Sequence, residues 1–311
     1  MPLHPQAQSV CDLVNAMGDV PPSNERLEEV RAGFATLVVM GAGAPEPVFA
    51  IDDTDADGVP IRVYRPSADR DLPVIVYFHG GGWTIGSVEQ FDLITRQIAN
   101  ATKAIVVSVD YRLAPEHPYP APLDDCWRAL TWVAKNAASF GGDGSRLAVM
   151  GDSAGGNLAA VCALLARDAG GPEIAMQVLV YPAVDGASLD TESYRDNAKG
   201  YLLTIDDMNW FYACYTSGGA DPTDWRISPL RAPDLRGVAP AVVVTAEFDP
   251  LRDEGDAYAL RLAEAGVPVA RYPYDGMIHA FFGLSAAFDA SRDALQRVST
   301  DLQRAFGTLS D

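Results

Sequence analysis

Short runs that are rich in β-branched and apolar residues recur along the chain and predict eight strands. The runs lie at residues 47–51, 61–66, 73–78, 104–109, 146–150, 175–181, 240–246 and 267–274. Several of them are apolar on both faces, as strands are when helices cover both sides of a parallel sheet. The pattern therefore predicts a mostly parallel sheet that is buried between helical layers.

Helical patterns separate the later strands. They cover residues 154–170, 250–266 and about 286–306. Strands that alternate with helices imply right-handed crossovers, so the predicted fold class is α/β with helices flanking the sheet.

Two segments interrupt this alternation. Residues 1–46 are mainly helical in pattern, and about 185–235 form a long insertion between the sixth and seventh strands. The insertion contains a helical run in which Thr204 is a plausible N-cap, with Asp207 three residues later. We expect both segments to form a helical cap on a catalytic domain of residues 47–311.

Composition narrows the class of protein. The 311 residues include 23 Lys+Arg and 42 Asp+Glu, which gives a net charge of −19, and 48% are hydrophobic. Such a chain is globular, and its acidity disfavours a nucleic-acid partner because phosphates repel it. No apolar run approaches the roughly 18 residues that a membrane span needs.

The N-terminus and the cysteines add two expectations. The first residues lack the charged and continuous apolar regions of a signal peptide, which predicts a cytoplasmic protein. The four cysteines, which show neither zinc-ligand nor redox spacing, are Cys11, Cys126, Cys162 and Cys214.

The strongest chemical signal is the G-x-S-x-G sequence at 151–155. It lies between a predicted strand and a predicted helix, which is the context of a nucleophile elbow. The helix N-terminus behind Ser153 favours developing negative charge. We therefore predict that Ser153 is a nucleophile rather than part of a turn made only for packing.

A serine nucleophile needs a base and an acid that orients the base. His279 is the only histidine after Ser153, in a loop that follows the last predicted strand. Asp249 follows the seventh strand and precedes a helical pattern, which is the position expected for the acid. Glu247 and Asp253 are its nearby rivals, and Asp253 also suits the first turn of a helix.

The sequence His79-Gly80-Gly81-Gly82-Trp83 directly follows the third strand. Consecutive glycines leave backbone N–H groups unobstructed, so we assign an oxyanion hole to the amides of Gly81, Gly82 and Ala154. The alternative is a phosphate cradle, but no P-loop or dinucleotide spacing is present. His79 more plausibly braces this loop than transfers protons, and we assign Asp152 no proton-transfer role.

Together these stretches resemble the bacterial hormone-sensitive-lipase-like (family IV) carboxylesterases of the α/β-hydrolase fold. The matches are HGGGW at 79–83, VDYRLAPEHPYPAPLDD at 109–125, GDSAGGNLA at 151–159, DPLRDEG at 249–255 and DGMIHAFFG at 275–283. The resemblance implies a serine esterase that acts on short- to medium-chain acyl esters, with the triad at Ser153, Asp249 and His279. It also makes a homodimer through the edge of the last strand plausible.

Ester hydrolysis by acyl transfer to Ser153, which the resemblance implies, needs neither a metal nor an organic cofactor, and the expected partner is a small-molecule ester. Residues that are candidates for the pocket wall are Trp83, Leu203, Met208 and Phe211. An amidase or formamidase would use the same triad, and a non-catalytic receptor on the same scaffold is a further alternative.

Overall fold

The structure, a computed structural model, describes residues 2–16 and 22–309 of the chain. Its strands form one eight-stranded sheet in the order β1-β2-β4-β3-β5-β6-β7-β8. They are β1 (Ala50–Asp55), β2 (Pro60–Arg65), β3 (Leu72–Phe78), β4 (Ile105–Val109), β5 (Gly142–Asp152), β6 (Met176–Val180), β7 (Ala241–Phe248) and β8 (Val269–Ile278). β1 and β2 are antiparallel to their neighbours, and β3 to β8 run parallel. The predicted α/β class and the mostly parallel sheet are therefore confirmed.

The bounds of the first strand correct the prediction. The run at 47–51 was chosen for its apolar residues, whereas β1 covers the polar run Ala50–Asp55 and pairs Ala50 with Arg65 through Asp55 with Pro60. An edge strand with mostly exposed side chains is held by main-chain pairing, so its sequence need not be apolar. β5 and β8 also extend beyond their predicted ranges.

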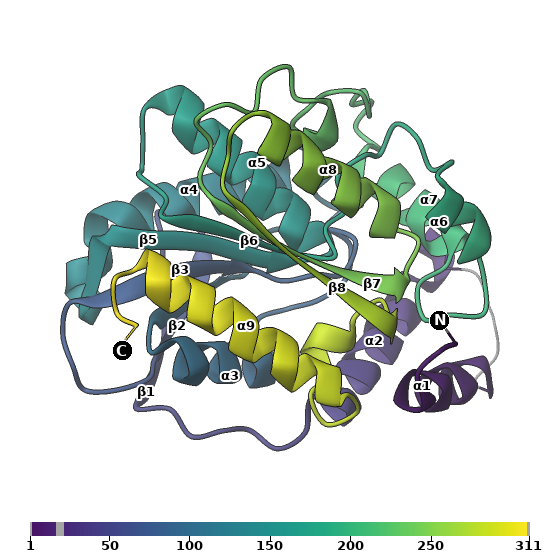
Figure 1. Ribbon diagram of the computed structural model, residues 1–311, viewed down its shortest axis with the longest axis horizontal. Coiled ribbons are helices and arrows are strands. Elements are labelled where there is room, and N and C mark those ends of the chain that lie inside the picture. Colours follow the sequence, from purple (N-terminus) through teal and green to yellow (C-terminus); the bar gives the residue numbers. More distant parts are fainter. Residues whose placement is uncertain (1, 17–21, 310–311) are drawn as a thin grey trace.

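Helices cover both faces of this sheet (Figure 1). α4, α5 and α8 pack on one face, and α3 and α9 pack on the other. The α-helices are α1 (Pro5–Ala16), α2 (Leu27–Ala42), α3 (Asp92–Thr102), α4 (Ala121–Asn136), α5 (Ala154–Ala169), α6 (Glu192–Asp196), α7 (Ile205–Tyr215), α8 (Arg252–Glu264) and α9 (Asp289–Ala305), and the 3₁₀ turns are η1 (Asn24–Arg26), η2 (Ala137–Phe140), η3 (Pro229–Arg231) and η4 (Phe281–Gly283).

The central strand β3 shows how the two faces divide the core. Val74, Val76 and Phe78 contact one apolar cluster, and Ile75 and Tyr77 contact the other. This is the alternation of a strand that is buried on both faces. The sheet is thereby a rigid support for the loops at the carboxyl ends of its strands.

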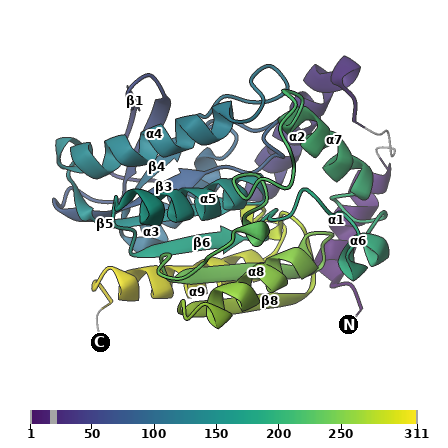
Figure 2. The same cartoon turned by 90° about the horizontal axis from the view of Figure 1, so that it is seen from above.

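The N-terminal helices and the insertion lie together at one end of the molecule, where α1, α2, α6 and α7 gather (Figure 2). The predicted cap of α7 is present, because Thr204 Oγ1 accepts from the amide of Asp207 at 3.1 Å while the Asp207 carboxylate accepts from the amide of Thr204 at 2.9 Å. This reciprocal pair satisfies two N–H groups that a helix start leaves open. It fixes where α7 begins, above the ends of the parallel strands.

Within the described residues, no helix combines the length and the apolar character needed to cross a membrane. The four cysteines are buried and unpaired. β8 lies at one edge of the sheet, as the dimer hypothesis requires.

Candidate active site

Ser153 sits on a sharp turn between β5 and α5. Its backbone has φ 55° and ψ −119°, a conformation that L-residues rarely adopt and that often marks a functional site. A Cβ added at Gly155 would collide with the carbonyl oxygens of Phe78 and His79, so the helix can approach β3 this closely only with glycine there. The turn has the geometry of the predicted nucleophile elbow.

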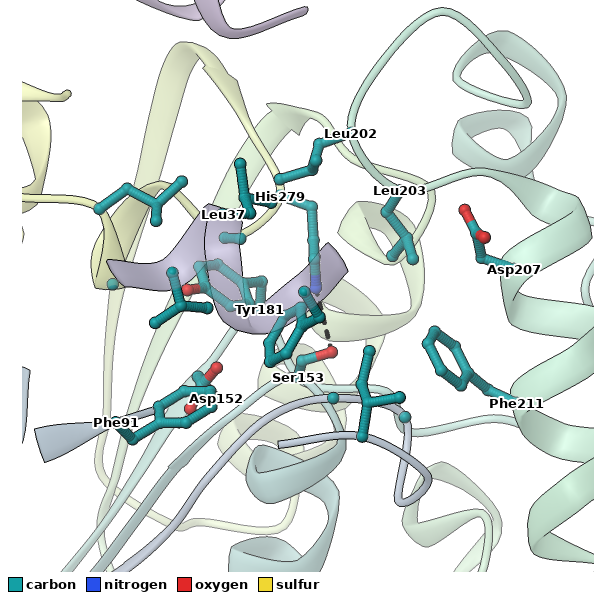
Figure 3. A pocket seen from close by; sticks show the side chains of 18 of the residues that line it. Leu37, Phe91, Asp152, Ser153, Tyr181, Leu202, Leu203, Asp207, Phe211 and His279 are labelled. Carbon is teal, nitrogen blue, oxygen red and sulfur yellow. Dashed lines mark hydrogen bonds between the residues drawn. The ribbon is translucent and has the colours of Figure 1, made fainter. Parts of the chain in front are cut away.

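His279 and Asp249 meet this serine from two other loops. His279 follows β8, and its Nε2 lies 3.0 Å from Ser153 Oγ (Figure 3). Its Nδ1 lies 2.6 Å from Asp249 Oδ2, in the loop after β7. All three residues are buried. A carboxylate can only accept from Nδ1–H, which leaves Nε2 as the acceptor for the serine proton.

The two rival carboxylates have other partners. Glu247 accepts from the amide of Gly276 at 2.7 Å, and Asp253 accepts from the amide of Ser193 at 2.7 Å in the first turn of α8. Asp249 is the carboxylate that contacts the imidazole, and its second oxygen accepts from the amide of Leu251 at 2.8 Å. Of the three candidate carboxylates, Asp249 is thus the one that the structure places against His279.

The glycine loop after β3 is anchored through its carbonyl oxygens. Thr84 and Ile85 donate their amides to Gly81 O at 3.0 and 2.9 Å, and His79 Nδ1 lies 2.7 Å from Gly80 O. Because C=O and N–H point in opposite directions across a trans peptide, the amides of Gly81 and Gly82 point away from these donors.

These amides are available to a ligand. Within the described residues the amides of Gly81 and Gly82 donate to no protein acceptor, and both glycines line the same pocket as Ser153. Ala154 is the first residue of α5, so its amide lacks an intrahelical acceptor. The structure thus brings two of the three predicted oxyanion donors, Gly81 and Gly82, into the pocket lining, and the third, Ala154, directly follows Ser153 at the start of α5.

His79 braces this loop, as the sequence suggested. Its ring stacks on Tyr111 at 4.3 Å and on Phe91 at 5.2 Å between ring centroids. Burial lowers the pKa of His79 to about 4, so the ring is neutral at pH 7. A neutral, fully buried imidazole that is bonded to Gly80 O holds the loop and is not placed to exchange protons with Ser153.

Asp152 connects the elbow to the same loop. Its Oδ1 accepts from the Tyr77 hydroxyl at 2.6 Å and from the amide of Gly80 at 3.0 Å. Burial raises the pKa of Asp152 to about 6, although the hydrogen bond from Tyr77 lowers it in part. The carboxylate binds backbone at the site, and this buried acid makes the stability of the protein depend on pH.

We expect Asp152→Asn to gain stability relative to the wild type as the pH rises from about 4 to 6. Folded wild type keeps the Asp152 proton up to about pH 6, whereas the unfolded chain releases it near its ordinary pKa of about 3.9, so the wild-type free energy of unfolding falls across this window. The full difference is on the order of 3 kcal/mol. Asparagine keeps an acceptor for both bonds and has no proton to release.

Urea unfolding followed by circular dichroism at several pH values measures this difference. Above the window, the difference between the two proteins is expected to stay constant. A difference that does not change with pH would contradict the assignment of the raised pKa to Asp152.

The pocket above Ser153 is apolar and has a volume of about 230 Å³. Figure 3 shows Tyr181 and Phe91 on one side of Ser153 and Phe211 and Leu203 on the other. Two of the predicted wall residues, Leu203 and Phe211, therefore line the pocket. A cavity of this size and character suits a small apolar substrate.

The other two predicted wall residues are corrected by the structure. Trp83 is fully buried and stacks on Tyr215 at 4.4 Å between ring centroids. Met208 is 2% exposed and belongs to the apolar core cluster. Neither lines the pocket, because both side chains belong to the buried apolar cluster on one face of the sheet.

Sequence reasoning missed a large part of the wall. Helix α2 supplies Val30, Phe34, Leu37 and Val38 to the pocket, and Tyr181 packs on the His279 ring at 4.5 Å between centroids. The helical period of α2 signals an apolar face, but it does not show which surface that face covers. Tyr181 directly follows β6. A position directly after a strand is also the signal that led to Asp249, so it could have identified Tyr181.

The insertion also touches the loop of the acid. The side-chain amide of Asn197 donates to the carbonyls of Glu247 and Asp249 at 3.4 and 3.3 Å, and the Ser193 hydroxyl donates to Pro250 O at 2.7 Å.

Within the described residues, no group of three or more His, Cys, Asp or Glu side chains is placed to hold a metal ion.

Comparison with known proteins agrees with this geometry. A family model described as the alpha/beta hydrolase fold matches residues 75–283. The chain belongs to the α/β-hydrolase family. Within that family, carboxylesterase NlhH from Mycobacterium tuberculosis is 48% identical over 252 residues, which cover 79% of this chain and 78% of that protein.

Two further relatives cover nearly the whole α/β hydrolase. An arylesterase from Saccharolobus solfataricus is 38% identical over 91% of this chain and 93% of its own length. The solved structure of a hyperthermophilic esterase from Pyrobaculum calidifontis has a TM-score of 0.92 at 40% identity, over 98% of this chain and 99% of that one. These relatives confirm the resemblance of this α/β hydrolase to the family IV carboxylesterases.

Proposed function

We propose that this protein hydrolyses short- to medium-chain carboxylic esters through Ser153, His279 and Asp249. The observation that carries the proposal is the series of hydrogen bonds from Ser153 through His279 to Asp249 at the floor of an apolar pocket. The named relatives are carboxylesterases and an arylesterase, which supports an ester as the substrate.

The geometry supports a two-step acyl transfer. His279 Nε2 takes the Ser153 proton while Oγ attacks the ester carbonyl, and Asp249 stabilises the imidazolium that forms. The carbonyl oxygen becomes an oxyanion that accepts hydrogen bonds from the amides of Gly81, Gly82 and Ala154. His279 then gives its proton to the departing alcohol. Water repeats the sequence on the acyl-enzyme and releases the acid.

Hydrolysis of p-nitrophenyl esters from acetate to palmitate tests the function. We expect kcat/KM to be highest for the short and medium acyl chains, because the cavity of about 230 Å³ is smaller than the roughly 300 Å³ at which drug-sized ligand sites begin. Absence of hydrolysis across the whole series would overturn the proposal.

We expect Phe211→Ala to shift the preference towards longer acyl chains. The Phe211 ring lines the pocket and lies over Gly82, where an added Cβ would collide with it. Removing the ring enlarges the pocket, so kcat/KM for octanoate relative to acetate should rise about 10-fold. That factor is about 1.4 kcal/mol, the burial of one to two extra methylenes at about 0.8 kcal/mol each. Steady-state kinetics on the same ester series measures this ratio.

Met208→Ala is the matched control for this variant. Met208 lies one turn earlier on α7, is also buried and does not line the pocket. Its truncation should lower the melting temperature and leave the chain-length profile unchanged. A profile that is the same in Phe211→Ala and wild type would reject the assignment of Phe211.

Three further features belong to this proposal. We place residues 1–46 and 185–235 as the two parts of a cap over a catalytic domain of residues 47–311. A homodimer through the exposed edge of β8 and a cytoplasmic location stay predictions.

A further inference from the structure

One arginine of the cap joins three separate segments. Arg31 on α2 donates from Nε to the Thr84 carbonyl at 3.1 Å. Its two terminal nitrogens bind the Glu116 carboxylate at 2.8 and 2.9 Å. The Arg31 side chain is only 23% exposed. A paired, bidentate guanidinium in this setting holds a defined geometry.

The C=O of Thr84 and the N–H of Ile85 belong to the same peptide unit. The N–H of Ile85 donates to Gly81 O at 2.9 Å. The C=O of Gly81 in turn shares a peptide unit with the N–H of Gly82. A hydrogen-bonded series therefore runs from the Arg31 guanidinium through two peptide units to the Gly82 N–H. Each bond in such a series polarises the next, so a cation at one end strengthens the donor at the other.

We propose that Arg31 is a positioning residue that aligns and polarises the Gly82 amide of the oxyanion hole from the cap helix. This inference rests on the proposed function. Arg31 does not line the pocket, so it acts through Thr84 and Ile85 and not by contact with the substrate. Thr84 also fixes the position of Gly82 directly, because its hydroxyl donates to Gly82 O at 2.9 Å.

Glu116 is the partner that keeps Arg31 in place. It comes from the proline-rich stretch after β4, and its hydrogen bonds with Arg31 lower the pKa of Glu116. The same helix α2 carries Val30, Phe34 and Leu37 into the pocket wall. Docking of α2 thus completes the apolar wall and aligns the oxyanion donor in one step.

Arg31→Met tests the proposal on the full-length protein. It keeps the length of the side chain and removes the donors. We expect kcat for p-nitrophenyl acetate to fall about 10-fold, less than the loss of a direct oxyanion donor, with KM within about twofold of the wild-type value. The inhibition constant of a trifluoromethyl ketone, which forms a tetrahedral oxyanion on Ser153, should rise by the same factor as kcat falls.

Arg26→Met is the matched control. Arg26 lies just before α2 and pairs with Glu29 on the surface at 2.9 Å, so its loss should change neither kcat nor the inhibition constant. Two results with Arg31→Met would overturn the proposal. One is an acetate kcat equal to that of the wild type. The other is an unchanged inhibition constant together with a raised KM for hexanoate, which would assign Arg31 to the pocket wall alone.

Glu116→Gln keeps the proposal testable where Arg31→Met does not fold. It leaves the bond from Arg31 to Thr84 possible but removes the ionic partner, so we expect an acetate kcat about threefold lower and a matching rise in the inhibition constant. Unchanged values would overturn the proposal. Wild-type protein that hydrolyses no ester would overturn the proposed function instead, before any variant is compared.

Discussion

Ser153→Ala should lower kcat for p-nitrophenyl acetate by a factor on the order of 10⁶, the scale of loss when a serine nucleophile is removed from a triad. Without Oγ, His279 has no proton to take and no acyl-enzyme forms. Alanine leaves the neighbouring glycines and the turn in place, so circular dichroism and the melting temperature should stay close to the wild-type values. Release of p-nitrophenolate by matched protein samples measures the change.

Ser145→Ala is the control for this substitution. Ser145 lies within β5, at the opposite end of the strand from Ser153, and is bonded to Asp143. The control should hydrolyse acetate at the wild-type rate. If Ser153→Ala were as active as this control, Ser153 would be excluded as the nucleophile.

Asp249→Asn should lower kcat on the order of 10⁴-fold while the protein stays folded. An amide in place of Oδ2 can donate to Nδ1, which favours the imidazole tautomer that carries its proton on Nε2. That tautomer cannot accept the Ser153 proton. The imidazolium formed during attack also loses its counter-charge. Steady-state kinetics with acetate, together with thermal unfolding, separates this loss from a loss of structure.

The rival acid Asp253 supplies the comparison. Asp253→Asn removes a charge near the start of α8 and weakens the bond to the Ser193 amide, which should cost a fraction of a kcal/mol to about 1 kcal/mol in stability. Its kcat should stay within about twofold of wild type, since Asp253 does not touch His279. Equal losses in the two variants would show that Asp249 has no special role.

Local sequence patterns were sufficient to predict most of the fold and the residues that the structure brings together around Ser153. Every strand except the polar edge strand β1 has enough β-branched or apolar residues to be recognised alone, and the elbow around Ser153 needs residue types that are adjacent in the sequence. Asp249 and His279, which the structure places beside Ser153, could be proposed from the sequence because each follows a strand. The identity of the other residues that line the pocket depends on which helix and sheet surfaces pack against each other.

Long-range packing explains what the sequence did not predict. The sequence offers Trp83 and Met208 as candidates for the pocket wall, yet both side chains turn into the core. Phe34 and Leu37 line the pocket together with Ser153 and Tyr181, which follow β5 and β6 and lie more than a hundred residues away from α2 in the sequence. The periodicity of a helix defines its apolar face but does not determine which part of the protein that face will contact.

The surroundings of Gly155 and Gly82 set different limits on how the protein can evolve. At Gly155 a side chain would meet the main chain of Phe78 and His79, and no second mutation removes a main chain. At Gly82 a side chain would meet the ring of Phe211, which a second substitution can shrink, but it would also have to adopt a φ of +56°, which L-residues rarely do. Gly155 therefore admits no side chain while α5 keeps its close approach to β3. At position 82 a smaller residue at 211 would remove the clash but not the backbone strain, so a new pocket shape there would come with a loss of stability.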